Sequence, residues 1–330
     1  MPANLPPEYF EVEKKYRQAR TIQEKIAVLR ELLSVVPKHK GTEKLQAEIK
    51  SKIARLRREA QEEKKTGRRT HTLYPRRQGA AQVALIGPPN AGKSSLLARL
   101  TSAHPTIAPF PFSTTLPVAG MMPYEDIQIQ LIDTSPILED HVDPWVLDIA
   151  RGADLLLLVL SLATDDLLDH FEVVTKRLEK HGITLVGSGV GEDALFGPVR
   201  KRTLIVATHL DASDAQDRLE ILKADLQGKF PLVAVSSETL EGLDQLPQQI
   251  FRELGIVRVY TKKPGKDPVL ENPLILKQGM TVLDAAEKLH KDFARNLKFA
   301  RLWGPSARFP GQRVERDHIL ADGDIVEFHV

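Results

Sequence analysis

The chain has 330 residues, of which 42% are hydrophobic and 27% charged, so it is long enough for two or three domains with buried cores. It contains no cysteine, which excludes disulfides, thiolate catalysis and cysteine-ligated zinc. The net charge of +2 hides an asymmetry, because residues 8–77 carry 20 Lys or Arg and 10 Asp or Glu, an excess of +10 against −8 in the remainder.

The basic N-terminal region predicts two helices. Residues 8–36 and 42–66 carry apolar side chains at helical spacing, and Pro37 ends the first of them. Two amphipathic helices with a short link predict an antiparallel hairpin, followed by a basic linker over residues 66–77. The excess charge either contacts a polyanion, most simply RNA, or only faces solvent. The cations of its outer face are Lys50, Lys52, Arg55, Arg57 and Arg58.

Residues 80–255 alternate between strand and helix patterns, which predicts a parallel sheet with helices on both faces. The strand at residues 127–132 contains alternating glutamines, so we expect one of its faces to be less buried. The apolar run at residues 155–160 predicts a central buried strand, and the proline-rich loop at residues 108–122 leads into an edge strand. The other strands are expected at residues 83–86, 203–207 and 232–235, the helices at residues 94–100, 142–151, 167–181, 217–227 and 243–254, and a loop at residues 187–198.

A proline-rich stretch at residues 264–273 indicates a boundary, after which a smaller module begins. This module combines short strands with one helix. Trp303 is expected to pack in its core, as tryptophans beside apolar neighbours most often do. Its predicted elements are strands at residues 274–276, 300–302 and 325–330 and a helix at residues 282–289.

Two observations bear on location. No apolar signal segment is visible in residues 1–18, and the longest apolar run, residues 155–160, is far too short to span a bilayer. The ten histidines show no metal-ligand spacing. We therefore expect a cytoplasmic protein with no membrane partner and no histidine-bound metal.

The most informative stretch is residues 83–100, VALIGPPNAGKSSLLARL, in which G-x-x-x-x-G-K-S stands between a strand and a helix. Glycines allow backbone N–H groups to wrap a phosphate, and the helix N-terminus adds partial positive charge. Lys93 can reach the outer phosphates of a nucleotide, and the Ser94 hydroxyl can ligate Mg²⁺. The residues predicted to contact the nucleotide here are Gly87, Pro88, Pro89, Asn90, Ala91, Gly92, Lys93, Ser94 and Ser95.

Two oxygen ligands further along the chain complete a predicted Mg²⁺ site with Ser94. Asp133 follows the strand at residues 127–132, where its carboxylate can hold a metal-bound water. Thr115 lies in the loop before that strand, where it can complete the Mg²⁺ shell and sense the γ-phosphate. A plain strand-end aspartate and a serine or threonine turn are the simpler alternatives. Together with Lys93, these two are the predicted catalytic residues.

The base of the nucleotide is expected to meet the stretch THLD, residues 208–211, which follows the buried strand at residues 203–207. The Asp211 carboxylate can accept both the N1–H and the exocyclic N–H of guanine, a donor pair that adenine lacks, so it favours GTP over ATP. A helix-capping aspartate is the alternative. The predicted contacts to the base are Thr208, His209 and Asp211, together with Ser236 and Ser237, which can present backbone N–H groups to the guanine oxygen.

The stretches GPPNAGKS, FSTTLPVAG, DTSPI, THLD and VSS follow the order and spacing of the five G-motifs of translation-factor-class GTPases, and FSTTLPVAG resembles the Obg-like branch. The helical hairpin resembles that of the DRG (developmentally regulated GTP-binding) proteins, and residues 268–330 resemble a TGS domain, a β-grasp module. The resemblance implies an α/β fold: a basic helical hairpin with its linker at residues 1–79, a P-loop GTPase domain at residues 80–260 and a TGS domain at residues 261–330.

Several departures from the family pattern affect this site. Pro136 replaces the glycine whose N–H would contact the γ-phosphate, and Ile137 stands where Ras-like enzymes place a water-positioning glutamine. Thr208 and His209 replace the asparagine and lysine of the base motif. The asparagine's brace on the P-loop is therefore expected to be lost and guanine affinity weakened, with the base preference unchanged. Ser237 replaces an alanine, which matters little because the backbone supplies the contact.

We therefore expect a slow, Mg²⁺-dependent GTPase that converts GTP to GDP and phosphate by in-line attack of water. Asn90 lies where some related GTPases coordinate K⁺, which makes K⁺ activation a further hypothesis. The implied partner is ribosome or RNA, contacted by the basic hairpin and the TGS domain, and no DNA partner is expected. The alternative is a nucleotide-binding scaffold with little hydrolysis because of Pro136, and Asp211 argues against an ATPase.

Overall fold

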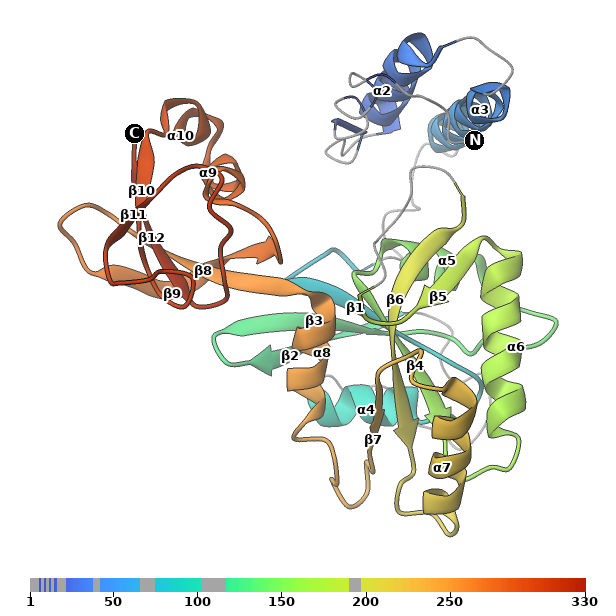
Figure 1. Cartoon of the computed structure of the whole chain (residues 1–330). Coiled ribbons are helices and arrows are strands. Elements are labelled where there is room, and N and C mark those ends of the chain that lie inside the picture. The colour runs from blue at the N-terminus through green and yellow to red at the C-terminus, as the bar shows by residue number, and fades with distance from the viewer. Residues whose placement is uncertain are drawn as a thin grey trace. The chain divides into compact units, whose positions relative to one another are not determined.

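The computed structural model describes residues 6, 9, 12, 15–16, 22–37, 42–65, 75–102, 117–189 and 197–330, and Figure 1 shows the chain from blue at its N-terminus to red at its C-terminus. The chain divides into two compact units, residues 1–74 with 191–200 and residues 75–190 with 201–330. Thr115 and most of the predicted loop at residues 187–198 lie outside the described residues.

The first unit contains the helices α2 (Ile22–Val35) and α3 (Glu43–Lys65). They confirm the two predicted helices within the described part of this region. Their apolar sides pack together around Leu29, Leu32 and Ile49, which are all fully buried. The amphipathic spacing therefore predicts the packing correctly, because each helix buries its apolar side against the other helix.

The predicted basic face of this hairpin is described only in part. Lys50 is exposed, and the Lys52 ammonium lies 5.2 Å from the centre of the Tyr16 ring, which is a cation–π contact. The remaining predicted cations, Arg55, Arg57 and Arg58, have side chains outside the described set. An RNA contact through this face therefore stays a prediction.

The second unit begins with a seven-stranded sheet in the order β2-β3-β1-β4-β6-β5, with β7 paired to β6. Strands β3, β1, β4, β6 and β7 run parallel, and β2 pairs antiparallel with β3 at the edge. This confirms the predicted α/β class with a parallel-rich sheet. The strands are β1 (Ala81–Ile86), β2 (Val118–Tyr124), β3 (Ile127–Asp133), β4 (Leu155–Ser161), β5 (Ile183–Val186), β6 (Val199–Thr208) and β7 (Leu232–Ala234), and the helices are α4 (Lys93–Leu100), α5 (Pro144–Gly152), α6 (Leu167–Lys180), α7 (Ala215–Leu226) and α8 (Leu246–Leu254).

The carboxyl ends of the parallel strands meet at one edge of this sheet, which is where ligands bind in open α/β folds. Strand β4 is buried along its whole length, as its apolar run predicts, and lies between β1 and β6. At the common edge β1 leads into Gly87, β3 ends at Asp133, β4 at Ser161 and β6 at Thr208. Sheet order thus gathers motifs that are far apart in the sequence.

One expectation for this sheet is wrong, and one of its strands is missing from the prediction. Every residue of β3 except Gln128 is buried, so the strand has no less-buried face. The glutamine at position 130 tolerates burial because its side-chain oxygen accepts from the Gln82 amide over 2.9 Å and its own amide donates to the Arg76 carbonyl over 2.9 Å. Strand β5 is absent from the prediction, because its four residues are too short to show an alternation.

A second sheet of five strands, in the order β11-β10-β12-β8-β9, forms the C-terminal part of this unit. One face packs on α9 (Val282–Leu289) through a buried core that includes Val259, Leu302 and Val326. The predicted helix at residues 282–289 is therefore confirmed, the predicted strands at residues 274–276 and 300–302 lie within longer strands, and the one predicted at residues 325–330 is found one residue earlier. The strands are β8 (Ile256–Lys262), β9 (Pro268–Lys277), β10 (Phe299–Trp303), β11 (Gln312–Val314) and β12 (Asp324–His329), and the short helix α10 (Lys291–Asn296) follows α9.

Three details of this part differ from the sequence pattern. The proline-rich stretch at residues 264–273 forms the turn between β8 and β9 and the first half of β9. Strand β8 is not among the predicted strands, and it runs across the expected boundary between residues 260 and 261; the three-domain division stays a prediction. Trp303 is half-buried and not in the core, because strand side chains alternate and Leu302 takes the inner position.

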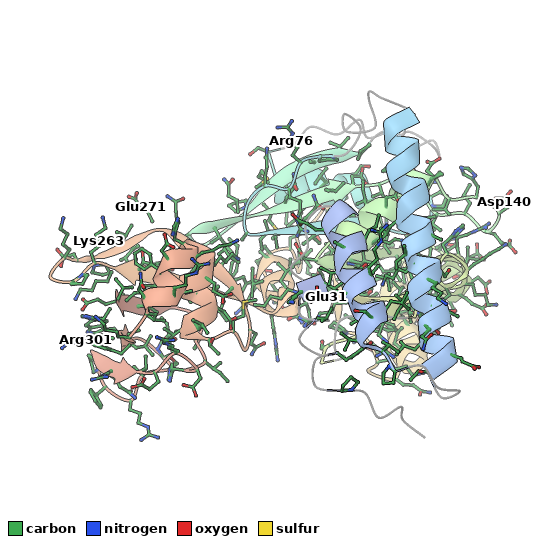
Figure 2. All side chains as sticks on the ribbon, turned by 90° about the horizontal axis from the view of Figure 1, so that it is seen from above. Glu31, Arg76, Asp140, Lys263, Glu271 and Arg301 are labelled. Atoms are coloured by element: carbon green, nitrogen blue, oxygen red, sulfur yellow. The ribbon has the colours of Figure 1, made fainter. Side chains whose placement is uncertain are left out.

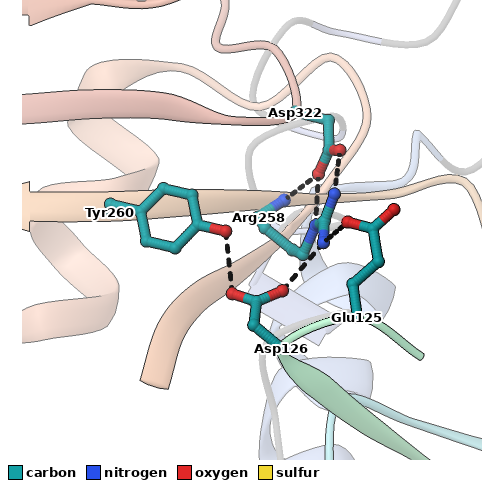
Figure 3. A network of polar contacts seen from close by, with 5 residues as sticks. All are labelled: Glu125, Asp126, Arg258, Tyr260 and Asp322. Atoms are coloured by element: carbon teal, nitrogen blue, oxygen red, sulfur yellow. Dashed lines mark hydrogen bonds and ion pairs between the residues drawn. The ribbon is translucent and has the colours of Figure 1, made fainter. Parts of the chain in front are cut away.

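A buried arginine links the turn between β2 and β3 to the second sheet, as Figure 3 shows. Arg258 on β8 is 8% exposed. Its Nη1 donates to Glu125 and, over 2.7 Å, to Asp126, and its Nη2 donates to Asp322 over 2.7 Å. The Tyr260 hydroxyl also donates to Asp126 over 2.7 Å, and burial together with this carboxylate raises the pKa of Tyr260 to about 12. One cation thus holds three carboxylates.

Replacing Gln130 with Ala should destabilise the first sheet, because it leaves the buried Gln82 amide without its side-chain partner. We expect the free energy of unfolding to fall by about 1–3 kcal/mol, the cost of an unsatisfied buried polar group. Urea denaturation followed by circular dichroism measures this change. The control is Gln82→Leu with Gln130→Leu, which removes both polar groups; a larger loss there than in Gln130→Ala would contradict the explanation.

Candidate functional site

The loop between β1 and α4 depends on backbone conformations that favour glycine. Gly87 has φ 154°, and a Cβ atom there would lie 2.3 Å from the Val159 carbonyl oxygen, so no larger residue fits. Gly92 has φ 85° and directly precedes α4. The predicted order of strand, glycine loop and helix is present, and the N-terminus of α4 directly follows the loop, where helix N–H groups favour an anion.

Lys93 lies at the start of α4 and is only 7% exposed. Its Nζ donates to the carbonyl oxygens of Pro88, over 2.8 Å, and Gly87, over 3.2 Å. Burial lowers the pKa of Lys93 to about 8, and the nearby Asp133 carboxylate opposes this shift. The loop therefore encloses an ammonium group whose two carbonyl partners could be exchanged for an anion.

Ser94 and Asp133 meet at the same place. The Ser94 hydroxyl donates to Asp133 Oδ2 over 2.5 Å, and Asp133 is fully buried at the end of β3. Hydroxyl and carboxylate oxygens are the ligands that Mg²⁺ prefers, so this pair fits a Mg²⁺ ion. Within the described residues, no group of three or more His, Asp or Glu side chains could hold a metal alone. Further ligands would therefore come from outside this pair, such as phosphate or water.

The segment after Asp133 is fastened by structural hydrogen bonds. The Thr134 hydroxyl donates to the Leu85 carbonyl over 2.7 Å, and the Ser135 hydroxyl donates to Asp143 over 2.5 Å. The Ile137 N–H donates to the Gly87 carbonyl over 3.0 Å, and its side chain is fully buried. The hydroxyls of Thr134 and Ser135 and the N–H of Ile137 thus already have hydrogen-bond partners within the protein.

Thr208 contacts the loop directly. Its hydroxyl lies 2.7 Å from the Ala91 carbonyl oxygen and 3.1 Å from that of Leu160, and the residue is 1% exposed. The expectation that the loop loses its brace with the asparagine is therefore wrong, because a threonine hydroxyl supplies the hydrogen bond. Nucleotide-binding measurements on Thr208 variants test the expected weakening of guanine affinity.

His209 occupies the position of the family's lysine and is held from two sides. Its Nδ1 lies 2.9 Å from the Ser161 hydroxyl and 3.1 Å from the Thr208 hydroxyl, and its backbone has φ 58°. The ring also lies beside the loop, since a Cβ atom on Gly92 would be 3.4 Å from His209 Cε1. The sequence analysis missed Ser161. It could have been found as the polar residue that directly follows the apolar run of β4.

Asp211 and Ser236 form a second cluster at the ends of β6 and β7. Asp211 is exposed, and the Ser236 hydroxyl donates to its Oδ1, which lowers the pKa of the Asp211 carboxyl. Ser236 is fully buried, and its N–H donates to the Glu241 carbonyl over 2.9 Å. The Ser236 N–H is therefore occupied, and the expected backbone contact to a base rests on Ser237.

The structure thus brings most predicted site residues to one edge of the first sheet. Ser95 and Pro89 are half-buried beside the loop, and Asn90 is exposed with φ 55°. Thr115 lies outside the described residues. In the part of the chain that the structure describes, no helix is both long and apolar enough to cross a membrane.

Comparison with known families gives two matches. The family model described as 50S ribosome-binding GTPase matches residues 82–187, and the TGS domain model matches residues 257–330. An uncharacterized GTP-binding protein of Methanocaldococcus jannaschii is 32% identical over an alignment that covers 92% of each chain. Developmentally-regulated G-protein 3 of Arabidopsis thaliana is 27% identical, covering 93% of this chain and 98% of that protein.

Among solved structures, a GTP-binding protein from Pyrococcus horikoshii is similar with a TM-score of 0.50 and 17% identity. The match covers 75% of this chain and 99% of that one. At this level of identity the likeness concerns the fold alone. It agrees with the parallel-rich α/β fold described above.

Replacing Thr208 with Val should weaken GDP binding about two- to tenfold, because it removes one buried hydrogen bond worth about 0.5–1.5 kcal/mol between the hydroxyl and the Ala91 carbonyl. Val keeps the shape of the side chain, and Thr208→Ser is the control that keeps the hydroxyl. Titration with a fluorescent GDP analogue gives the three Kd values. Equal affinities of the Val and Ser variants would show that the hydroxyl does not brace the loop.

The pKa of Lys93 near 8 predicts a pH-dependent affinity for GTP. Above this pH the free protein holds a neutral amine, whereas a bound triphosphate favours the charged form, so binding takes up a proton. The Kd for GTP should rise from about pH 8 upward, by at most about tenfold per pH unit, and change little near pH 7. Titrations between about pH 7 and pH 9 measure it. The residual binding of Lys93→Ala should lack this dependence, and a constant wild-type Kd would refute the argument.

Proposed function

Because this chain belongs to the family of P-loop GTP-binding proteins that carry a TGS domain and include the developmentally regulated G-proteins, we propose that it is a slow GTPase that converts GTP to GDP and phosphate. One observation carries the proposal. The buried Lys93 ammonium and the pair of Ser94 and Asp133, 2.5 Å apart, lie at a loop that can enclose a phosphate.

The triphosphate would bind to the N–H groups of the loop and to the N-terminus of α4. Lys93 would exchange its two carbonyl partners for phosphate oxygens and stabilise the charge that develops as the bond to the β–γ bridging oxygen breaks. Ser94, Asp133 and, as a proposed third ligand, Thr115 would hold Mg²⁺, which would neutralise charge on the β- and γ-phosphates. A water molecule attacks the γ-phosphorus in line, and GDP leaves.

Slow turnover follows from the segment after Asp133. The Ile137 side chain is fully buried where a glutamine would orient the water, and its N–H is bonded to the Gly87 carbonyl. The Ser135 hydroxyl is used on Asp143. An efficient reaction would therefore need a group supplied by a partner or an ion.

The base would be selected by Asp211. The hydrogen bond from the Ser236 hydroxyl lowers the pKa of the Asp211 carboxyl. The ionised carboxylate can accept hydrogen bonds from the two N–H groups of guanine. The Ser237 N–H is the proposed donor to the guanine oxygen. His209, fixed by Ser161, is the proposed neighbour of the ring in place of a lysine.

Asn90, exposed at the tip of the loop, is the proposed ligand of an activating K⁺ ion. We propose ribosome or RNA as the partner and the cytoplasm as the location. The name of the matched family and the excess of +10 charges in residues 8–77 support this choice of partner. The proposed division of labour is a basic hairpin (residues 1–79), a GTPase domain (residues 80–260) and a TGS domain (residues 261–330).

The test is the conversion of GTP to GDP by the purified chain with Mg²⁺, in K⁺ and in Na⁺ buffer, with ATP as the competing substrate. We expect GTP-selective turnover that is faster in K⁺ and that Lys93→Ala lowers at least about 100-fold, as loss of transition-state charge stabilisation does. Equal turnover rates in K⁺ and Na⁺ buffer would refute the proposed K⁺ site. Added ribosomes should raise the rate if they are the partner.

Two outcomes would contradict the proposal in different ways. GTP binding without turnover, with and without ribosomes, would leave a nucleotide-binding scaffold, as the absence of an N–H at Pro136 would explain. Turnover that persists in Lys93→Ala would come from a contaminating enzyme. Asp211→Ala separates base selection from chemistry, because it should reduce the preference for GTP over ATP while the phosphate contacts remain.

A further inference from the structure

A charge at the surface does not by itself single out a functional residue. The charged residues that Figure 2 labels, such as Asp140 and Lys263, are exposed. Arg218, in the first turn of α7, differs from them, because its side chain is only 17% exposed and its guanidinium is bonded to two loops at once. A cation that is withdrawn from water needs acceptors that replace its hydration. The acceptors of Arg218 therefore show what it holds together.

The guanidinium of Arg218 ties the loop after β4 to the loop after β6. On the first side, its Nε donates to Asp165 Oδ1 over 2.8 Å, and its Nη1 donates to the Leu162 carbonyl over 3.1 Å. On the other side, the same Nη1 donates to the Ser213 carbonyl over 2.7 Å. A guanidinium presents several N–H groups in one rigid plane, so it can bond to several acceptors at fixed angles. One planar group thus sets the spacing between the two loops.

Both loops carry residues of the proposed base site. The loop after β4 begins directly after Ser161, whose hydroxyl lies 2.9 Å from His209 Nδ1. The loop after β6 contains Asp211, whose carboxylate is proposed to accept the two N–H groups of guanine. The Ser213 carbonyl that Arg218 holds lies two residues further along this loop. The guanidinium therefore lies behind both groups that are proposed to meet the base.

The loop that carries Asp211 adopts a conformation that needs support. His209 at its start and Asp214 at its end have φ values of 58° and 59°, in the left-handed region that residues other than glycine enter at a cost in free energy. Asp214 also precedes α7 without a side-chain hydrogen bond that would cap the helix. Such conformations persist where the surrounding structure holds them. Because Ser213 directly precedes Asp214, its bond to Arg218 holds the loop at this end.

We propose that Arg218 is a positioning residue for recognition of the base, because it holds the Asp211 loop in the conformation in which the carboxylate meets guanine. Asp211 is exposed, and the Ser236 hydroxyl fixes its side chain but not the backbone that carries it. Arg218 supplies the second constraint, which acts on that backbone. The inference rests on the proposed function and adds to it a residue that sets the strength of the preference for guanine.

The experiment measures base selectivity with two nucleotides that have the same phosphates. Inosine diphosphate (IDP) lacks the exocyclic amino group of GDP, so it loses one of the two N–H groups proposed to meet Asp211. Competition with a fluorescent GDP analogue gives both Kd values, and their ratio measures the contribution of that N–H. The test variant is Arg218→Gln in the full chain. The matched control is Arg151→Gln on α5, because Arg151 also pairs with an aspartate, Asp148, and donates to a backbone carbonyl, that of His181.

We expect the unaltered chain and the Arg151→Gln variant to bind GDP about tenfold or more tightly than IDP, as one hydrogen bond to a charged group predicts. Arg218→Gln should lower this ratio about three- to tenfold, the equivalent of one ordinary hydrogen bond, mainly by raising the Kd for GDP. In an Asp211→Ala background, Arg218→Gln should leave the ratio unchanged, because no carboxylate remains to be positioned.

Three results would overturn the inference. An unchanged ratio in Arg218→Gln would show that the Asp211 loop keeps its position without the guanidinium. An equal rise of both Kd values would show a general loss of structure and no specific role in base recognition. A fall of the ratio that persists in the Asp211→Ala background would show that Arg218 acts through another group.

A milder variant keeps the test open if circular dichroism shows that Arg218→Gln does not fold. Asp165→Ala removes one acceptor of the guanidinium, and the Asp165 side chain is 90% exposed, so the fold should tolerate the change. This variant should lower the ratio about twofold, the value of an exposed ion pair. An unchanged ratio would again contradict the inference.

The same data separate the inference from the proposed function. An unaltered chain that binds neither GDP nor IDP would contradict the proposed function, and one that binds both equally would contradict base selection by Asp211. Either result would remove the inference as well. A preference for GDP that survives Arg218→Gln would remove the role of Arg218 alone and leave the proposed function standing.

Discussion

The carbonyl oxygen of Gly87 receives two donors from different parts of the site, the Nζ of Lys93 at 3.2 Å and the N–H of Ile137 at 3.0 Å. A carbonyl oxygen has two lone pairs and can accept both. The backbone of Gly87 also lies so close to the Val159 carbonyl that only glycine fits there. In the proposed function a phosphate would draw the lysine away, and the bond from Ile137 could persist, so the segment after Asp133 would stay attached to the loop while Lys93 changes partners.

The base motif shows how a substituted motif keeps its mechanical role. A threonine is shorter than an asparagine, yet Thr208 reaches the loop because β6 ends close to it, and its hydroxyl lies 2.7 Å from the Ala91 carbonyl. His209 is steadied by Ser161 at the end of the adjacent strand β4. Thr208 and His209 are therefore held through the ends of two neighbouring strands, β4 and β6.

The sequence alone predicts the features that are local along the chain. The glycine loop, the buried run of β4 and the helix at residues 282–289 depend on spacing within a few residues, and all are found. The missed features pair residues that are distant in the sequence. Thr208 and Ala91 are 117 positions apart, and Gln130 and Gln82 are 48 apart. Which strands become neighbours decides such pairs, and no single-strand pattern encodes that choice.

Arg258 has a consequence for how the chain folds. Its carboxylate partners Glu125 and Asp126 lie 133 and 132 positions before it, and Asp322 lies 64 positions after it. The entropy of closing such long loops must be overcome before these ion pairs can form. The bonds to Asp322 can form with the second sheet alone, whereas those to Glu125 and Asp126 need both sheets in place, so these two contacts are expected to form late in folding.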